Sequence, residues 1–191
     1  MDVALGWKAH SGWAALVAVG RDRARGAVLV DRRRVELVEP GESWARQPYH
    51  AAEGLAREAA HDLVRRGIAS AERVAEREIG AAVGRARAAG HAVRACAVLV
   101  GAAGMPPWST DEILAVHFRM HKAEGELFRG ALVEGARRCG VALVTLTEKE
   151  RARRATRLGD TLAALGKSAG PPWGRDQKDA ALAAWIALGG N

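Results

Sequence analysis

The first forty residues alternate between short apolar runs and charged or glycine-containing turns. Apolar runs cover residues 3–7 and 13–19, and two further runs, 27–30 and 35–38, are joined by three consecutive arginines. Short apolar runs separated by turn residues are typical of antiparallel strands connected by hairpins. This part of the chain therefore predicts a three-stranded meander.

After Tyr49 the apolar positions follow a helical period. The spacing predicts one helix over residues 55–66, ended by Gly67, and a second helix that is capped by Ser70 and ends at Ala89. Residues 92–100 carry no charge after Arg94, which is typical of a strand buried on both faces.

The remaining elements predict a second strand of this kind among helices. A loop over residues 101–107 leads to a helix capped by Ser109 or Thr110, with Asp111 and Glu112 in its first turn. The other predicted segments are this helix to residue 138, a strand over 141–146, a helix over 148–165, a Gly/Pro linker over 166–174 and a last helix over 176–188.

This order of elements predicts one α/β domain over residues 1–191. We expect a five-stranded mixed sheet, with strands one to three antiparallel, the fourth and fifth parallel to the first, and helices on its faces. The composition agrees, because 49% hydrophobic and 27% charged residues suffice for a core in a chain of 191 residues. We expect Cys96 and Cys139 to be unpaired thiols in a reducing compartment.

No apolar stretch approaches the roughly 18 residues that cross a bilayer, and no secretory pattern opens the chain. We therefore expect a cytoplasmic protein that does not contact membranes. The net charge of +7 permits two interpretations, a nucleic-acid partner or a compositional bias toward Ala, Arg and Gly. Most arginines alternate with acids, and only residues 32–34 and a group formed by Arg151, Arg153, Arg154 and Arg157 are clustered.

Three segments resemble a known family. Residues 5–14 (LGWKAHSGWA) are similar to its first hairpin, and residues 124–132 (EGELFRGAL) with 139–144 (CGVALV) to its long helix and fifth strand. Lys167 and residues 176–183 (DQKDAALA) are similar to its closing segment. On these segments the chain resembles the RuvC-type Holliday-junction resolvases of the ribonuclease-H-like superfamily, which implies a ribonuclease-H-like sheet.

The resemblance also implies a site that this sequence does not reproduce. Active members hold two divalent metal ions with carboxylates on the first strand, at the end of the fourth strand and on the last helix. Here Lys8 stands on the first strand, and Gly101 ends the fourth, where we expect no acid near it. Asp176 and Asp179 remain, together with His10 as a further catalytic candidate, although both aspartates also suit the capping of the last helix. We therefore expect no standard nuclease activity.

A second candidate site lies on the helix after the fourth strand. His117, His121 and Glu124 fall within about 60° of one another around a helix, on an arc that also carries apolar residues. We expect the three side chains to be mostly buried and to face the same cleft as His10. Histidines at i and i+4 can hold a metal ion, and a hydrogen-bonded His–Glu cluster is the alternative.

Three hypotheses of function follow. The first is a RuvC-like domain that binds nucleic acid or a protein partner, with Lys8, Lys178 and Trp173 as nucleic-acid contacts, although a tryptophan in such a linker often packs on the core. The second is a hydrolase that uses a divalent metal ion in a His/Glu/Asp cleft at the carboxyl end of the sheet. The third is a structural or regulatory module without an active site.

Overall fold

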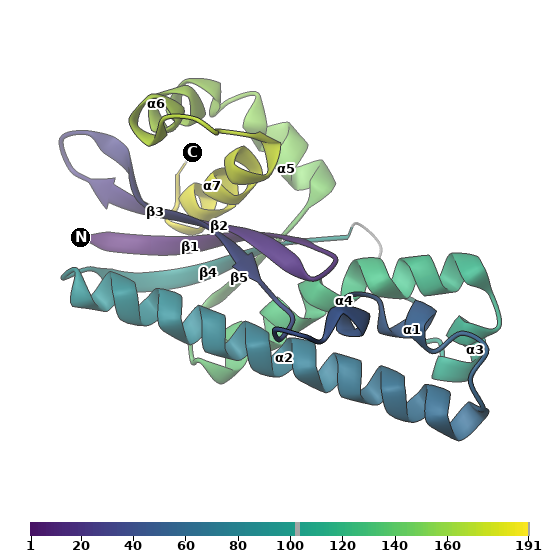
Figure 1. Ribbon diagram of the computed structural model, residues 1–191. Coiled ribbons are helices and arrows are strands. Elements are labelled where there is room, and N and C mark those ends of the chain that lie inside the picture. Colours follow the sequence, from purple (N-terminus) through teal and green to yellow (C-terminus); the bar gives the residue numbers. More distant parts are fainter. Residues whose placement is uncertain (102–103, 191) are drawn as a thin grey trace.

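The computed structural model describes residues 1–101 and 104–190, so two residues of the predicted loop after the fourth strand lie outside the described residues. Its centre is one sheet with the strand order β3-β2-β1-β4-β5 (Figure 1). β1 pairs antiparallel with β2, β2 antiparallel with β3, and β4 lies parallel to both β1 and β5. The predicted mixed sheet is therefore confirmed. The strands are β1 (Asp2–His10), β2 (Trp13–Asp22), β3 (Gly26–Glu36), β4 (Ala92–Val100) and β5 (Leu143–Thr147).

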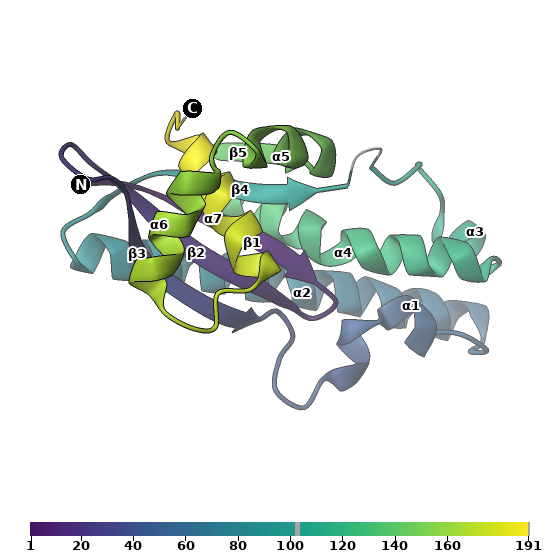
Figure 2. The ribbon, with the colours of Figure 1, turned by 90° about the horizontal axis from the view of Figure 1, so that it is seen from above.

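Helices cover both faces of the sheet. The long helices α2 and α4 lie on one face and extend beyond the end of the strands, whereas α5, α6 and α7 lie on the other (Figures 1 and 2). None of the helices in the described ranges combines the length and the apolar character that crossing a membrane requires. The helices are α1 (Pro48–Ala51), α2 (Arg57–Ala88), α3 (Thr110–Leu114), α4 (His117–Arg138), α5 (Glu148–Ala155), α6 (Gly159–Ala169) and α7 (Arg175–Ala187), with a 3-10 turn η1 (Ser43–Arg46) before α1.

The central strand β1 is buried on both faces because successive side chains point to opposite sides of a strand. Leu5 and Trp7 are at most 1% exposed in the core beneath α2 and α4, and Ala4 is fully buried in the core beneath α7. Both cysteines are free, with Cys96 buried in the first of these cores, as expected.

Gly67 and Ser70 do not mark the helix boundaries that the sequence predicts. α2 is one helix of 32 residues that continues through Gly67 and Ser70, where a stop and a new cap were predicted. Gly67 is retained for close packing, since a Cβ there would lie 2.5 Å from Cβ of Pro48 on α1. The hydroxyl of Ser70 donates to Glu42 at 3.0 Å instead of capping a helix.

Other boundaries also differ from the prediction. The helix predicted to end at residue 138 is broken at Val116, which has extended backbone angles, and Arg119 donates to the carbonyl of Glu112 across the break. The segment 148–165 likewise forms two helices, α5 and α6. β3 runs straight through the three arginines, and Arg32 donates to the carbonyl groups of Gly170, Pro171 and Pro172.

The contact between Gly67 and Pro48 can be tested within one helix. Gly67→Ala should destabilise the protein by about 1–3 kcal/mol, because the added methyl group displaces a rigid proline ring. Gly84→Ala on the same helix should stabilise it by about 0.5–1 kcal/mol, because alanine favours helix and a Cβ at Gly84 meets nothing within 4 Å. Urea denaturation of both variants measures the difference, and equal effects would contradict this packing role.

Candidate functional site

The candidate site forms where α7 lies directly on β1. A Cβ at Gly6 would lie 1.9 Å from the carbonyl oxygen of Ala180 and 3.0 Å from the amide nitrogen of Ala184, so only a glycine permits this approach. Lys8, two residues further along the strand, points to the same face as Gly6. The close contact therefore places Lys8 beside Asp179, the residue that precedes Ala180.

Lys8 belongs to a chain of alternating charges, here called the ion-pair cluster: Lys8, Glu148, Arg151 and Asp179. The ammonium group of Lys8 donates to Oε1 of Glu148, the first residue of α5. Nε of Arg151 lies 3.0 Å from Oε2 of Glu148, and its Nη1 lies 2.9 Å from Oδ1 of Asp179. The side chains of Lys8, Arg151 and Asp179 are only 14%, 18% and 6% exposed, so most of the cluster is shielded from water.

The two carboxyl groups of the cluster have opposite pKa shifts. The hydrogen bond from Lys8 lowers the pKa of Glu148, and Arg151 acts in the same direction. Burial raises the pKa of Asp179, even though Arg151 and Lys8 favour its charged form. Asp179 therefore depends on neighbouring cations to remain ionised inside the fold.

His10 and Asp176 meet beside the cluster, as the sequence predicts for the end of β1 and the start of the last helix. His10 Nε2 lies 3.0 Å from Oδ1 of Asp176, and the imidazole stacks on Trp13 with ring centroids 4.4 Å apart. The guanidinium of Arg34 lies over the same indole ring, 3.7 Å from its centroid. The side chain of Gln177, rather than either aspartate, accepts the hydrogen bond from the Gly174 backbone at the start of α7.

The end of β4 corrects one prediction. An acid does lie near Gly101, because a Cβ there would lie 2.3 Å from Oε1 of Glu126. Glu126 comes from α4, which packs back along the sheet, so its proximity is invisible in the local sequence. The same Oε1 accepts a hydrogen bond of 2.9 Å from Arg129.

The second candidate site has a different composition from the one predicted. His117 and His121 lie side by side but are exposed, so the expected burial is wrong for both, whereas Glu124 is only 3% exposed. The two histidines do lie on one side of the helix, as their spacing predicts. They are exposed because they occupy the first turns of α4, which extend beyond the end of the sheet (Figure 1). The third imidazole beside them is that of His50 on α1.

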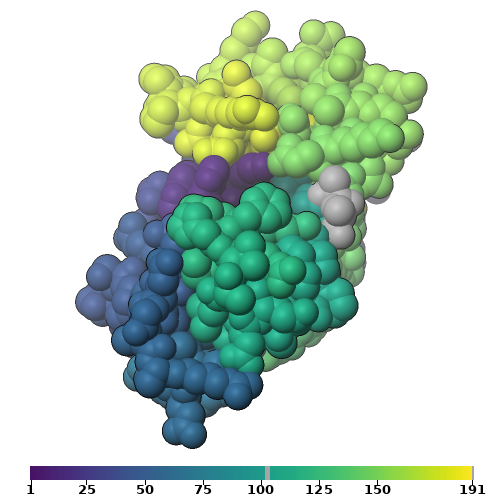
Figure 3. Space-filling view, turned by 90° about the vertical axis from the view of Figure 1, so that its right-hand side faces the viewer, coloured from purple at the N-terminus to yellow at the C-terminus, as the bar shows by residue number. Residues whose placement is uncertain are grey.

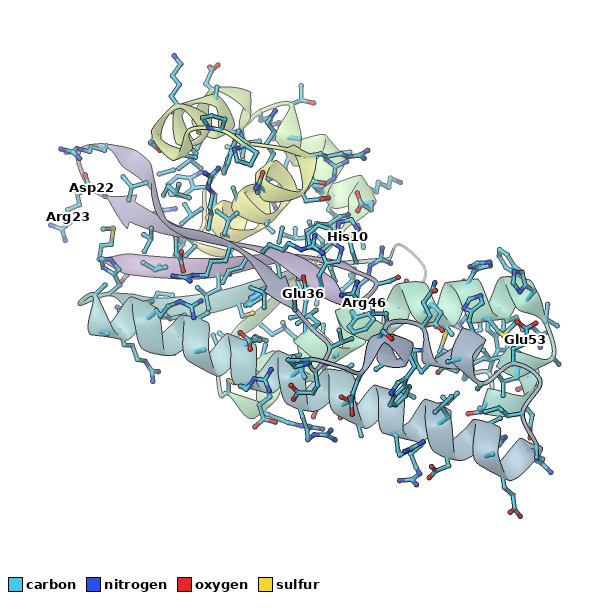
Figure 4. The ribbon with its side chains drawn as sticks, viewed as in Figure 1. His10, Asp22, Arg23, Glu36, Arg46 and Glu53 are labelled. Atoms are coloured by element: carbon cyan, nitrogen blue, oxygen red, sulfur yellow. The ribbon has the colours of Figure 1, made fainter. Side chains whose placement is uncertain are left out.

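Glu124 connects α4 to α1. Its Oε1 accepts hydrogen bonds from the backbone amides of Tyr49 and His50 at 2.8 and 3.2 Å and lies 3.4 Å from Nδ1 of His50. Burial raises the pKa of Glu124, while these donors act in the opposite direction. The expected common cleft with His10 does not form. His10 lies at the end of β1, whereas Glu53, which follows α1 and so marks the region of His50, lies beside the beginning of α2, well away from His10 (Figure 4).

The predicted nucleic-acid contacts are separated in the structure. Lys8 is enclosed in the ion-pair cluster and Lys178 is exposed on α7. Trp173 is half-buried among apolar residues and lies against Gly166, where a Cβ would be 2.6 Å from its ring. The face at the carboxyl end of the strands, viewed directly in Figure 3, shows the first hairpin between α5–α7 above and α1–α4 below.

The local sequence did not reveal Glu148 as the partner of Lys8, Arg151 as the partner of Asp179, or His50 as a partner of the α4 histidines. The position of Glu148 directly after a predicted parallel strand was a usable signal, because such strand ends gather at one edge. Arg151 was grouped with the other arginines of its segment. Nothing in the local sequence indicated the direction of His50.

The fold is an α/β fold of the ribonuclease-H-like type, with a five-stranded mixed sheet covered by helices. The solved structure of Thermus thermophilus RuvC in complex with a Holliday junction substrate matches with a TM-score of 0.55 and 13% identity, covering 100% of this chain and 98% of that chain. A second T. thermophilus RuvC structure gives the same TM-score and identity, with 98% and 96% coverage. No protein-family model and no curated protein matches the chain. At this identity the likeness establishes the fold.

The dependence of Asp179 on Arg151 predicts a pH-dependent defect. Arg151→Gln should destabilise the protein by about 3 kcal/mol at neutral pH, because it leaves a buried carboxylate without its closest cation. A carboxyl group whose folded pKa is raised takes up its proton more readily in the folded state, so its destabilising effect fades as the pH falls through the folded pKa toward the unfolded value of about 3.9. Urea denaturation across this range measures the trend.

The matched control is the double variant Arg151→Gln/Asp179→Asn, which removes the buried carboxylate itself. Its loss of stability should vary much less with pH. A defect of Arg151→Gln that is equally large at every pH would show that Arg151 acts through packing rather than through charge.

Proposed function

We propose that this chain is a nucleic-acid-binding domain in which the ion-pair cluster takes the place of a two-metal nuclease site. The observation that carries the proposal is the pairing of Lys8 with Glu148 and of Arg151 with Asp179. Two-metal phosphodiester cleavage requires several anionic oxygens that converge on the cations. In this cluster each carboxylate already has a cationic partner, and the ammonium group of Lys8 would repel a metal ion.

The nearest other acids do not restore such a site. Asp176 is in contact with His10, and Glu126 of α4, which lies near Gly101, pairs with Arg129. The arrangement therefore supports a domain that has kept the fold of a resolvase without its usual metal chemistry.

The positive charge has a specific location that favours binding over compositional bias. Arg153, Arg154 and Arg157 line one pocket of about 300 Å³ with Leu158 and Gly190. Within the described chain, none of the three arginines lies within ion-pair distance of a carboxylate, whereas Arg33 and Arg34 of β3 and most of the arginines on α4 do pair with acids. Unpaired guanidinium groups are suited to phosphate, which they bind through charge and paired hydrogen bonds.

The pocket is formed by residues that follow the ion-pair cluster along the chain, together with Gly190 beyond the end of α7. Arg153 and Arg154 follow Arg151 of the ion-pair cluster on α5, and Arg157 lies in the turn after this helix. T. thermophilus RuvC, which has this fold, is solved in complex with a Holliday junction substrate. We infer that the phosphate backbone of a bound nucleic acid lies along α5. The exposed Lys178 and the indole ring of Trp13 would then provide further contacts.

The binding proposal predicts a specific salt dependence. Arg153→Ala/Arg157→Ala should weaken binding and lower the slope of log K against log salt by about 2, because each lost phosphate contact removes about one unit. Arg73→Ala/Arg87→Ala is the matched control, since both arginines are exposed on α2 and the net charge changes equally. Fluorescence anisotropy with junction, single-stranded and duplex DNA measures both.

Equal effects of the two double variants would show that only net charge matters. Failure of the protein to bind any of these nucleic acids would contradict the proposal and favour a protein partner.

The nuclease part of the proposal predicts no cleavage. Purified protein with Mg²⁺ or Mn²⁺ should leave a labelled four-way junction intact under conditions in which an active metal-dependent resolvase cleaves it. The physical reason is the shortage of free carboxylates around Lys8. Cleavage that is abolished by Asp176→Asn or Asp179→Asn would show that these residues do hold catalytic metal ions.

A further inference from the structure

Three imidazoles from two distant parts of the sequence converge at the beginning of α4. We call His50, His117 and His121 the histidine cluster. Each offers one ring nitrogen, and the three nitrogens all lie within 4.8 Å of one another. His117 and His121 are one helical turn apart on α4, and their Nε2 atoms are separated by 3.0 Å. His50 completes the group from α1, with its ring centroid 4.7 Å from that of His121.

The orientation of the His50 ring is fixed by Glu124. Its Nδ1 faces Oε1 of Glu124 at 3.4 Å, and Glu124 also binds the backbone amide of His50. The other ring nitrogen, Nε2, is buried and has no hydrogen-bond partner among the residues that the structure describes. A buried polar atom without a partner is unfavourable in a folded protein and calls for an explanation. Here that nitrogen belongs to a ring that faces two further imidazoles.

We propose that the histidine cluster is a binding site for a divalent transition-metal ion such as Zn²⁺. Three nitrogens around one tetrahedral zinc at about 2.1 Å are separated by about 3.4 Å, and the observed separations span this value. Neutral imidazole suits zinc and similar ions, whereas Mg²⁺ and Ca²⁺ require oxygen ligands. The set of three nitrogens thus selects the class of metal.

Glu124 acts in this site as a positioning residue. A carboxylate that accepts the proton of one ring nitrogen fixes the tautomer and leaves the other nitrogen free to bind a metal. At the same time its bonds to the Tyr49 and His50 amides hold α1 against α4. The metal ion would join the same two helices a second time, and the exposure of His117 and His121 leaves a fourth position open to water.

A hydrogen-bonded histidine pair does not account for the whole arrangement. If both His117 and His121 are neutral, one Nε2 can donate to the other, but Nε2 of His50 then still lacks a partner. If they are protonated, two cations lie side by side. A shared metal ion uses all three nitrogens at once. This inference is independent of the nucleic-acid proposal, because the histidine cluster consists of other residues, on α1 and at the start of α4.

The test is direct titration of the untagged, metal-free protein with Zn²⁺ by calorimetry, with Co²⁺ absorption as a report on coordination. One ion per chain should bind, and Co²⁺ should give the intense visible bands of a tetrahedral site. His50→Ala and His117→Ala should each weaken Zn²⁺ binding by more than about a hundredfold, and Glu124→Gln by about 10–100-fold. His91→Ala, a histidine outside the cluster, is the matched control and should leave binding unchanged.

Two results would overturn the proposal. If His50→Ala binds Zn²⁺ as tightly as the original protein, the metal is held only by the surface pair on α4. If no variant differs from His91→Ala, zinc binds elsewhere or non-specifically. Circular dichroism of each variant verifies its folding, and should His50→Ala fail to fold, His117→Ala on the exposed helix surface decides the question.

Discussion

The close contact between Gly6 of β1 and the backbone of α7 determines much of this structure. Because no side chain separates them, the helix lies within van der Waals distance of the central strand, and its buried face can consist almost entirely of alanine. The same closeness draws Asp179 into the fold beside Lys8. A bulkier residue at Gly6 would move the whole helix, and with it both aspartates, away from the end of β1.

The ion-pair cluster is the electrostatic consequence of that packing. A carboxylate buried by the approach of α7 needs a cation, and Arg151 provides one from α5 while Lys8 and Glu148 extend the alternation to the strand. Pairs of this kind often contribute little net stability compared with apolar packing, yet breaking one is strongly unfavourable. The cluster therefore fixes the arrangement of β1, α5 and α7 more than it strengthens it.

The sequence carried enough information for the sheet and much less for the site. Apolar runs and hairpin turns identified all five strands, and the pairing of β1 with β4 followed from the resemblance and the order of elements. Gly67 misled because a glycine needed for close packing has the same local pattern as a helix stop. Glu148, Glu126 and His50 reach their partners only through tertiary contacts, so their roles could not be read from neighbouring residues. The pairing of His10 with Asp176 was predictable because both follow from which ends of the elements meet.

The three arginines within β3 also affect how the protein behaves among its own copies. β3 is an edge of the sheet, and an edge presents unpaired backbone groups to which a strand of another molecule can add. Arg32 donates to the linker before α7, while Arg33 and Arg34 pair with Asp31 and Glu36 of the same strand. A second copy that added to this edge would have to accommodate these charged side chains. Charged residues on an edge strand thus disfavour self-association by β-sheet extension.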